Sequence, residues 1–403
     1  MKLHRNIALG IMSALEKTLL EKRNARNTLK KLLKSNPNWG STDRRIIAKV
    51  FYDIVRQKRL FEILTGDENS ASNFWNLIGC WMVLNNHMLP KWDEFKDIDD
   101  IKIKSKVKTF HNERKYRYSI PDWLDEMGEA EYGENIWEKE MAALNTPADF
   151  IIRVNTLKTS TSNLKDQLEK KYNLITHLIP NYPVALRFEK KQSIHRVKEY
   201  RDGWFEVQDA NSQKIAPWLE PKSGKYYIDA CAGAGGKSLH LANLTNDSAK
   251  ILALDINNAK LKELKKRCYR NNFQSIHIKN VEHGEILKSL DRNADGVLID
   301  APCSGLGVIK RNPCAKWNIT RDRLTEILNM QEKILQTYAP MVKKGGIIVY
   351  VTCSILPIEN SLQVFKFLNS ELGSRFELDS EKTYFSHETG FDGFYCARLI
   401  DKM

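Results

Sequence analysis

The segment that decides the fold is Tyr227-Ile-Asp-Ala-Cys-Ala-Gly-Ala-Gly-Gly-Lys-Ser238. An apolar run enters it, a glycine-rich turn fills its centre, and leucines at helical spacing follow it, which predicts a strand, a tight turn and a helix. Glycines let the backbone approach a ligand closely, and the start of a helix offers free N–H groups. About 20 residues further on, Asp255 ends the next predicted strand, where a carboxylate can accept hydrogen bonds from ribose hydroxyls.

Three classes of ligand compete for this turn. A nucleoside triphosphate loop needs its first glycine at position 231, where this chain has Cys231. A dinucleotide loop accepts Gly233 and Gly235 but needs a third glycine at position 238, where the chain has Ser238. S-adenosylmethionine remains, because its methyltransferases use a looser glycine turn with the same downstream acid. The turn therefore favours S-adenosylmethionine as the cofactor.

The second half of the chain alternates short apolar strands with helices. This rhythm predicts an α/β fold with a doubly wound parallel sheet of the class I, Rossmann-like kind in a catalytic domain at 216–403. A strand at 150–156 and a helix at 159–171 predict a small α+β subdomain at 118–215. The strands of the larger sheet are predicted at 226–229, 251–255, 276–279, 297–300 and 347–351, with a long helix at 321–338.

Residues 1–117 have apolar side chains every three or four positions, which predicts an all-helical domain. Its first residues are predicted to form an amphipathic helix and not a signal peptide, and no apolar stretch is long enough to span a membrane. Lysines alternate with other residues at 102–108, which predicts an exposed strand or an extended basic linker.

The net charge and the cysteines indicate the class of partner and the cellular setting. Lys and Arg number 63 against 50 Asp and Glu, a net charge of +13 that favours a polyanionic partner. The seven cysteines include no Cys-x-x-Cys pair, which argues against a zinc ribbon or a disulfide framework. We expect a reduced, cytoplasmic setting, no structural metal and a monomer.

Two cysteines follow predicted strands of the larger sheet. Cys303 comes just after the strand that ends at Asp300, and Cys353 comes just after the strand at 347–351. In an open α/β sheet the ligand crevice lies outside the carboxyl ends of the strands. Both thiols are therefore expected to face the cofactor, although a lone free cysteine is more often an inert core residue.

Methylation of C5 of cytosine explains why a thiol is needed there. C5 is a poor nucleophile until a thiolate adds to C6 and makes the ring enamine-like, and this covalent step divides one difficult reaction into easier ones. The thiolate is the reactive form, so the cysteine must be activated by its surroundings. A carboxyl such as that of Asp300 can hydrogen-bond N3 and offset the charge that develops on the ring.

These residues resemble the bacterial ribosomal RNA cytosine-C5 methyltransferases of the Sun/Fmu type over about residues 118–403. The combination of two cysteine motifs with the glycine loop is highly specific. The strongest matches are Asp229-Ala-Cys-Ala-Gly-Ala-Gly-Gly-Lys-Ser238, Asp300-Ala-Pro-Cys-Ser-Gly305, Gly307-Val-Ile-Lys-Arg-Asn-Pro313 with Trp317, and Tyr350-Val-Thr-Cys-Ser354 with Glu359-Asn-Ser361. Weaker matches are Arg153-Val-Asn-Thr-Leu157, Val207-Gln-Asp-Ala210 and Asp392-Gly-Phe394.

The resemblance implies a role for each matching residue. Cys353 would be the nucleophile, Cys303 would help to release the methylated product, and Asp300 would lie where cofactor and substrate meet. Asp255 would bind the ribose, and Glu282, or its neighbour Asn280, would lie near the adenine. The loop residues implied to hold the cofactor are Cys231, Ala232, Gly233, Ala234, Gly235, Gly236 and Lys237.

The N-terminal domain is similar to a short NusB-like domain around Asp43-Arg-Arg-Ile-Ile-Ala-Lys-Val-Phe-Tyr-Asp-Ile-Val-Arg56, which implies RNA binding. The implied substrate is small-subunit ribosomal RNA, either naked or in an assembling subunit. A methyltransferase for DNA or transfer RNA, a ribosome-assembly factor that only binds, and a nucleotide-dependent oxidoreductase remain alternatives. DNA cytosine methyltransferases attack with a Pro-Cys motif cysteine, so the Thr-Cys-Ser motif argues for RNA.

Overall fold

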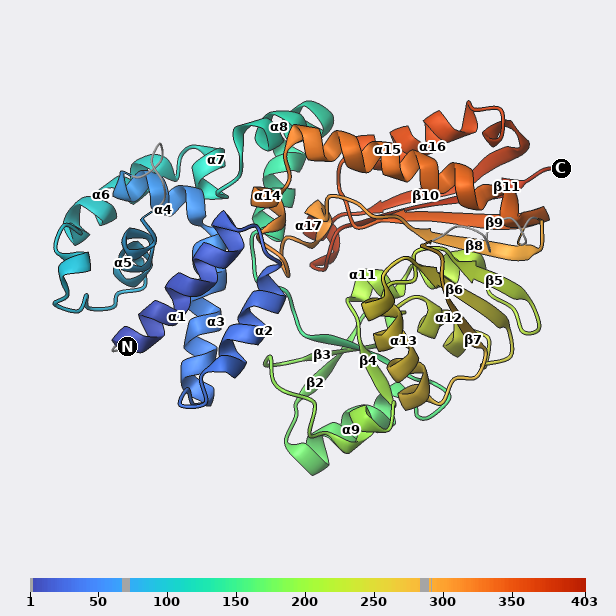
Figure 1. Ribbon diagram of the computed structural model, residues 1–403, viewed down its shortest axis with the longest axis horizontal. Helices are drawn as coiled ribbons and strands as arrows, with labels where there is room; N and C mark the ends of the chain where they lie inside the picture. The colour runs from blue at the N-terminus through green and yellow to red at the C-terminus, as the bar shows by residue number, and fades with distance from the viewer. Residues whose placement is uncertain (1–2, 67–72, 283–289, 291) are drawn as a thin grey trace. The chain divides into compact units, whose positions relative to one another are not determined.

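The computed structural model describes residues 3–66, 73–282, 290 and 292–403. The chain divides into two compact units, one helical and one α/β (Figure 1). The helical unit comprises Met1–Thr146 and Val308–Arg321, and the α/β unit comprises Pro147–Gly307 and Asp322–Met403. The predicted combination of a helical N-terminal region and a Rossmann-like α/β sheet is confirmed.

The helical unit contains one long helix, α8, which is interrupted at Gly133 by a non-helical backbone with φ of 72° and ψ of 160°. Residues 16–20 extend α1 as a π-helical turn. The helices of this unit are α1 (Arg5–Leu15), α2 (Ala25–Ser35), α3 (Ser41–Arg56), α4 (Lys58–Thr65), α5 (Phe74–Leu84), α6 (Asp100–Phe110), α7 (Arg114–Arg117), α8 (Asp122–Leu144) and α14 (Ala315–Asn318).

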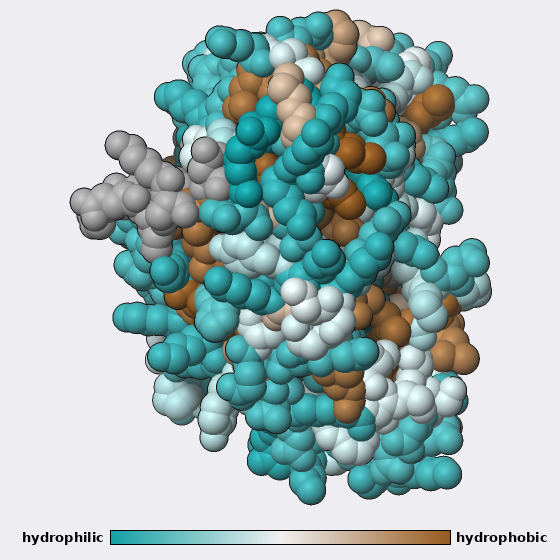
Figure 2. Space-filling view, turned by 90° about the vertical axis from the view of Figure 1, so that its right-hand side faces the viewer, coloured by the Kyte–Doolittle hydropathy of each residue, from teal (hydrophilic) through white to brown (hydrophobic). Residues whose placement is uncertain are grey.

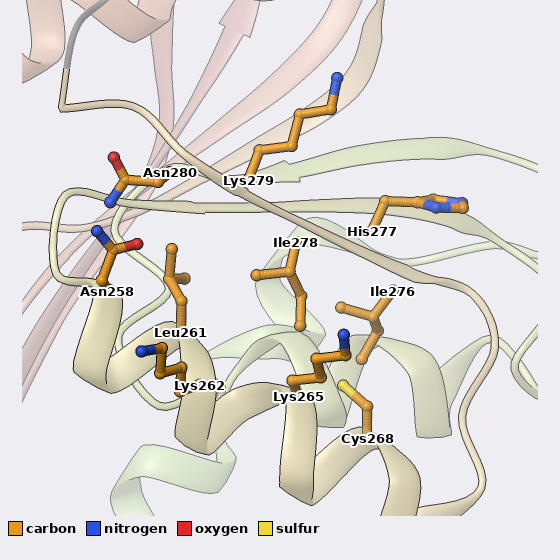
Figure 3. A pocket seen from close by; sticks show the side chains of 10 residues that line it. All are labelled: Asn258, Leu261, Lys262, Lys265, Cys268, Ile276, His277, Ile278, Lys279 and Asn280. Atoms are coloured by element: carbon orange, nitrogen blue, oxygen red, sulfur yellow. The ribbon is translucent and has the colours of Figure 1, made fainter.

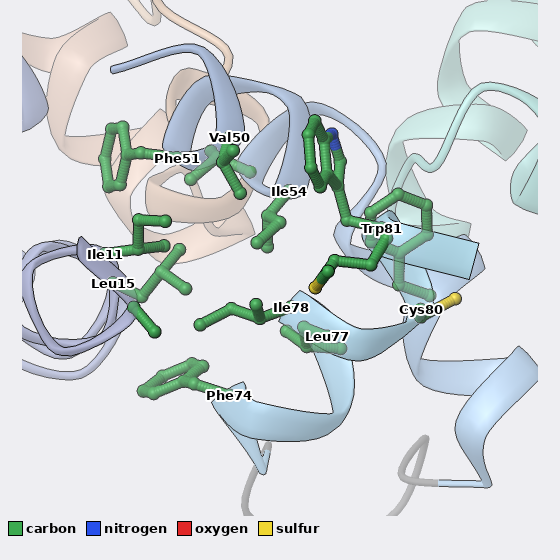
Figure 4. Packing of buried hydrophobic residues seen from close by; sticks show 14 of the residues in the cluster. Ile11, Leu15, Val50, Phe51, Ile54, Phe74, Leu77, Ile78, Cys80 and Trp81 are labelled. Carbon is green, nitrogen blue, oxygen red and sulfur yellow. The ribbon is translucent and has the colours of Figure 1, made fainter. Parts of the chain in front are cut away.

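The core of the helical unit is formed by apolar side chains at helical spacing. Ile11 and Leu15 of α1 point toward Val50 and Ile54 of α3 and toward Ile78 of α5 (Figure 4). All five side chains are excluded from solvent. Their i, i+4 spacing places them on one face of each helix, which is why the sequence pattern identified this region as helical.

The prediction of an exposed strand or linker at 102–108 is wrong, because this segment lies in α6. Asp99 caps the helix by accepting a hydrogen bond from the Lys102 N–H at 2.9 Å. Ile103 is buried in the core, and Val107, one turn later, packs against it. Ile103 and Val107 are therefore four residues apart, as on one face of a helix. The lysines at every second position made the segment look like an alternating strand pattern.

The segment Val308–Arg321, which follows the motif of Cys303, is built into the helical unit. Lys316 anchors it, because its buried ammonium donates to the carbonyls of Arg56 and Tyr118 and to the side-chain oxygen of Asn145, at 2.7, 2.9 and 3.0 Å. Burial lowers the pKa of Lys316 well below its ordinary value. Three oxygen acceptors satisfy the three N–H groups of the ammonium, so no carboxylate is needed to hold it.

The α/β unit begins with a four-stranded antiparallel sheet in the order β2-β3-β1-β4, with α9 packed against it. Its core is formed by buried apolar residues of β1, β3, β4 and α9. The elements are β1 (Ile151–Val154), α9 (Thr161–Tyr172), β2 (Thr176–Ile179), β3 (Tyr182–Phe188), α10 (Lys198–Arg201), β4 (Phe205–Val207) and α11 (Ala210–Gln213).

The larger sheet has seven strands in the order β10-β11-β9-β8-β5-β6-β7. The five strands predicted from the sequence, β5 to β9, run parallel, and β10 and β11 add an antiparallel edge. The order reverses between β5 and β8, which is where a doubly wound sheet opens its ligand crevice. The strands are β5 (Tyr226–Asp229), β6 (Lys250–Asp255), β7 (Ile276–Asn280), β8 (Ala294–Asp300), β9 (Val342–Thr352), β10 (Phe376–Tyr384) and β11 (Phe394–Asp401).

Helices cover both faces of this sheet (Figure 1). Alternate residues of the strands pack against α12 and α13 on one face and against α15 and α16 on the other, which forms two separate cores. Burial on both faces explains why the central strands are continuously apolar. The helices are α12 (Ser238–Leu244), α13 (Asn258–Asn271), α15 (Arg321–Tyr338), α16 (Ser361–Leu368) and α17 (Ser386–Thr389).

The outer surface is hydrophilic over most of the face seen in Figure 2, where apolar side chains form small separate patches. Among the described residues, no helix is both long enough and apolar enough to cross a membrane.

Gly128 of α8 provides a stability test. A Cβ at this position would lie 2.3 Å from Cε2 of Trp137, whose ring is fully buried and whose Nε1 donates to Asp125 at 2.8 Å. We expect Gly128→Ala to lower the free energy of unfolding by about 1–3 kcal/mol through overpacking. The control Gly40→Ala, whose Cβ would meet nothing nearer than 3.8 Å, should change it by less. Equal effects in urea denaturation would contradict this packing.

Candidate active site

The glycine loop runs from the end of β5 to the start of α12. Gly233 and Gly235 have φ of +55° and +83°, a backbone region that favours glycine. A Cβ at Gly235 would lie 2.0 Å from Cδ1 of Leu264, so only glycine lets α13 approach the loop this closely. The predicted residues Cys231 to Lys237 thus form a tight turn at the carboxyl edge of the sheet.

Asp255 lies at the end of β6 and is tied to the loop. One carboxylate oxygen accepts the Gly233 N–H at 2.8 Å, and the other accepts the Asn257 N–H at 2.7 Å. Each oxygen retains a lone pair, so the group is held in place while it can still accept from a diol. Next to it, the apolar side chain of Ile256 is 67% exposed at the same edge, a feature that the sequence analysis did not single out.

The residue predicted to lie near the adenine, Glu282 or Asn280, is less closely connected to the glycine loop. Glu282 follows β7, is exposed, and donates its backbone N–H to the side chain of Asn280 at 3.0 Å. Asn280 in turn donates to the carbonyl of Ile256 at 2.9 Å. Among the described contacts, Asn280 therefore reaches the Asp255 region, and the Glu282 carboxylate has no hydrogen bond to it.

Asp229 ends β5 directly below the loop. One of its carboxylate oxygens accepts the Ser238 hydroxyl at 2.6 Å, and the other is buried with no hydrogen-bond partner in the described part of the chain. Burial, opposed by the Ser238 hydrogen bond and reinforced by Asp300, raises the pKa of Asp229 to about 7. An unpaired buried acceptor beside the loop suits a cationic ligand such as S-adenosylmethionine, whose charge would favour the ionised carboxylate.

The small antiparallel sheet supports the loop from the other side. Arg153 of β1 donates to the Gly236 carbonyl at 3.0 Å, and Arg267 of α13 donates to the Ala234 carbonyl at 2.6 Å. The buried Glu206 of β4 orients Arg267 through two hydrogen bonds of 2.9 and 3.1 Å. The sequence analysis missed Glu206 and Arg267, because nothing local connects a strand residue with a helix about 60 positions away.

Lys237 joins the cofactor loop to the thiol side of the site. Its ammonium donates to Asp300 at the end of β8 at 2.6 Å, and it lies 5.5 Å from the ring centre of Phe394. Burial opposes the charge on Lys237, but the charge of Asp300, their hydrogen bond and the nearby Cys353 together raise its pKa above the ordinary value. Lys237 is therefore a cation at neutral pH, beside both a carboxylate and a thiol.

The structure brings the two predicted cysteines together. Asp300 of β8 is level with Val351 of β9 in the sheet, so both motifs leave from the same edge. The Sγ atoms of Cys303 and Cys353 are 3.2 Å apart, close enough for one thiol to donate a hydrogen bond to the other sulfur. This bond to Cys353, with burial and the charges of Cys353 and Glu359, raises the pKa of Cys303 well above its usual value.

A separate groove of about 550 Å³ lies between α13 and the edge strand β7 (Figure 3). It contains neither cysteine and no residue of the glycine loop, so it is not the chemical centre. Lysines line its rim above a floor that includes Leu261, Ile276 and Ile278.

Comparisons with known families agree with this geometry. The family described as 16S rRNA methyltransferase RsmB/F matches residues 216–400. A second description, the RsmF/B-like ferredoxin-like domain, matches residues 120–195. The matched ranges include the glycine loop and both cysteine motifs in the first case, and β1, β2 and β3 in the second.

Relatives are known from sequence and from structure. The "Probable ribosomal RNA small subunit methyltransferase B" of Synechocystis is 34% identical over 70% of this chain and 67% of its own. The "Ribosomal RNA small subunit methyltransferase B" of Shigella flexneri is 33% identical over 72% and 68%. Two solved structures share the fold. PH0851 has a TM-score of 0.80 and 23% sequence identity, and the match covers 99% of this chain and 100% of that chain. NSun6 from Pyrococcus horikoshii with SFG has a TM-score of 0.64 and 20% sequence identity, and the match covers 70% of this chain and 98% of that chain.

The contact between Arg267 and the Ala234 carbonyl predicts a residue outside the loop that controls cofactor affinity. We expect Arg267→Gln to weaken S-adenosylmethionine binding about tenfold, because the loop loses a charge-assisted hydrogen bond. Isothermal titration calorimetry measures the affinity. Lys266→Gln, one residue away and exposed, is the matched control and should bind as wild type. Unchanged affinity in Arg267→Gln would contradict the support that we assign to the small sheet and α13.

Proposed function

Because this chain belongs to the RsmB/F family of 16S rRNA methyltransferases, which are S-adenosylmethionine-dependent enzymes, we propose that it methylates C5 of a cytosine in small-subunit ribosomal RNA through a covalent adduct of Cys353. The observation that carries this proposal is the 3.2 Å approach of Cys353 to Cys303 at the carboxyl edge of the sheet, beside Lys237 and Asp300. A protein that only binds RNA has no use for two adjacent thiols at a cofactor site, whereas a cysteine-dependent methyltransferase does.

S-adenosylmethionine is the cofactor, and it supplies an electrophilic methyl group on sulfonium. We assign its binding to the loop residues Cys231 to Lys237 and its ribose to Asp255. The fit rests on the positive-φ glycines, on the free lone pairs of Asp255 and on the unpaired oxygen of Asp229. For the adenine we favour Ile256 and Asn280 over Glu282, because Asn280 is tied to the backbone beside Asp255.

Cys353 is the nucleophile in this proposal. In this mechanism its thiolate, with the Lys237 ammonium nearby, adds to C6 of cytosine and raises electron density at C5. Asp300 is within hydrogen-bond distance of Lys237, so it can share a proton with that cation while it contacts N3 of the ring. After C5 has taken the methyl group and lost its proton to a base, the bond between C6 and Cys353 breaks and the thiolate leaves.

Cys303 assists that last step. Its pKa is raised, so it is a thiol at neutral pH and can donate a hydrogen bond to the departing Cys353 sulfur, which stabilises the thiolate as the leaving group. The two cysteines are then chemically unequal despite their contact, with Cys353 as the attacking sulfur and Cys303 as the donor.

RNA is the partner that the charge of the chain favours. We propose that the basic helical unit binds RNA as a NusB-like domain, and that the exposed face of α13 contacts RNA phosphates. Lys262, Lys265, Lys266 and Tyr269 share that face, and the tyrosine is 90% exposed. Lys262 and Lys265 border the groove of Figure 3.

The target cytosine must be single-stranded or flipped out, since a paired base is out of reach. A ribosomal RNA substrate, naked or in an assembling subunit, fits a cytoplasmic enzyme.

The nucleophile assignment is tested with labelled methyl groups. Wild type should transfer methyl from S-adenosylmethionine to cytosine C5 of 16S ribosomal RNA, Cys353→Ala should fall to background, and Cys303→Ala should accumulate a covalent RNA adduct because release is blocked. Denaturing gels detect the adduct, and nucleoside analysis identifies the product. DNA and transfer RNA serve as competing substrates. Label on either of these instead, or an active Cys353→Ala enzyme, would reject the proposal.

The RNA surface is tested by reversing its charge. We expect the triple variant Lys262→Glu, Lys265→Glu and Lys266→Glu to lose affinity for a 16S transcript and to reduce the slope of log affinity against log salt by about three, with cofactor binding unchanged. A control with the same charge change uses three exposed lysines that lie before β5, near the start of β9 and after β11: Lys222→Glu, Lys344→Glu and Lys402→Glu. Equal losses in both triple variants would mean that α13 acts only through net charge.

A further inference from the structure

A single buried carboxylate lies between the two cysteine motifs. Glu359 is fully excluded from solvent and ends the short 3-10 helix Pro357–Glu359 that follows Cys353. One of its oxygens accepts the backbone N–H of Ser304 at 2.7 Å and the side-chain amide of Gln331 at 3.2 Å. The other accepts the hydroxyl of Ser304 at 2.5 Å and the hydroxyl of Ser354.

These partners occupy equivalent places in the two motifs. Ser304 directly follows Cys303, and Ser354 directly follows Cys353. The same carboxylate therefore fixes the residue after each thiol, and the two serine hydroxyls lie 3.2 Å from each other. The two sulfur atoms are also 3.2 Å apart, so the motifs contact each other twice, once through the thiols and once through the serine hydroxyls. Glu359 binds both serines.

Neighbouring residues make this connection rigid. Tyr350 donates its hydroxyl to the carbonyl of Glu359 at 2.8 Å. The side-chain oxygen of Asn360 accepts the Thr352 hydroxyl at 2.5 Å, and its amide donates to the Ser354 carbonyl at 3.1 Å. The backbone on both sides of Cys353 is thereby held to the Glu359-Asn360 pair, and its thiol has little freedom to move from Cys303.

A purely structural role does not explain why a charged group stands at this position. A buried carboxylate is costly to desolvate, and among the described residues its four hydrogen-bond donors, one backbone N–H and three side-chain groups, are all neutral, with no lysine or arginine. A neutral acceptor would avoid that cost. A negative charge has a further effect on the thiols, because Glu359 is one of the groups that raise the pKa of Cys303, after Cys353 and burial.

We propose that Glu359 is a positioning residue that holds Cys303 against Cys353 and, through its charge, keeps Cys303 in the thiol form while Cys353 is the attacking thiolate. The inference rests on the proposed function for the meaning of the two thiols. The arrangement of Cys303 relative to Glu359 can be measured without RNA, so the failure of one proposal is distinguishable from the failure of the other.

The test compares Glu359→Gln with wild type in the full-length protein. Alkylation by iodoacetamide is followed against pH, and mass spectrometry separates the peptides of Cys303 and Cys353. We expect the alkylation midpoint of Cys303 to shift to lower pH in Glu359→Gln, because the negative charge that disfavoured its thiolate is gone. We also expect kcat for RNA methylation to fall about tenfold or more, with KM for S-adenosylmethionine unchanged, since only the thiols are disturbed.

One surface variant and two serine variants accompany Glu359→Gln. Glu326→Gln makes the same charge change on the exposed surface of α15 and should alter neither reading. If Glu359→Gln does not fold, as judged by cofactor binding, the variants Ser304→Ala and Ser354→Ala each remove one contact with Glu359 but keep its charge. In these variants kcat should fall, with KM for S-adenosylmethionine unchanged and little shift of the Cys303 profile. An unchanged Cys303 profile in folded Glu359→Gln would overturn the proposal even if activity falls, and so would wild-type kcat in both serine variants.

Discussion

The 2.6 Å ion pair between Lys237 and Asp300 connects the two halves of the proposed active site. Lys237 belongs to the glycine loop, and Asp300 ends the strand from which the Cys303 motif departs. Removing either partner would leave a charge in a largely buried place, which costs several kcal/mol, so the pair constrains how the loop and the thiol side meet. The pair also lies beside the thiols, because Cys353 is close enough to Lys237 to contribute to its raised pKa.

Buried polar contacts hold the segments on both sides of this pair. The small antiparallel sheet supports the glycine loop through Arg153, and its Glu206 orients Arg267 against the same loop. On the other side, Glu359 and Asn360 fasten the segments that carry the two cysteines. The α/β unit thus fixes the cofactor loop and the thiols through separate sets of buried polar groups.

The sequence was sufficient where the signal is local. Strands β5 to β9 carry continuous apolar runs, and the glycine loop and both cysteines follow strand ends, so their common edge could be predicted from the rules of parallel sheets. The helix α6 was missed because lysines between Ile103 and Val107 produced an apparent alternation. Glu206, Arg267 and the connecting role of Glu359 could not be derived, because their partners lie far away in sequence and only the folded chain brings them together.

The central claim is that Cys353, held beside Cys303 and Lys237, attacks C6 of the target cytosine. A 16S transcript containing 5-fluorocytosine tests it most directly, because fluorine cannot leave C5 as a proton does and the covalent adduct persists. After digestion, mass spectrometry identifies the cysteine that carries the nucleotide. The account predicts the adduct on the peptide of Cys353. An adduct on the peptide of Cys303, or none in an enzyme that methylates the unmodified transcript at C5, would contradict it.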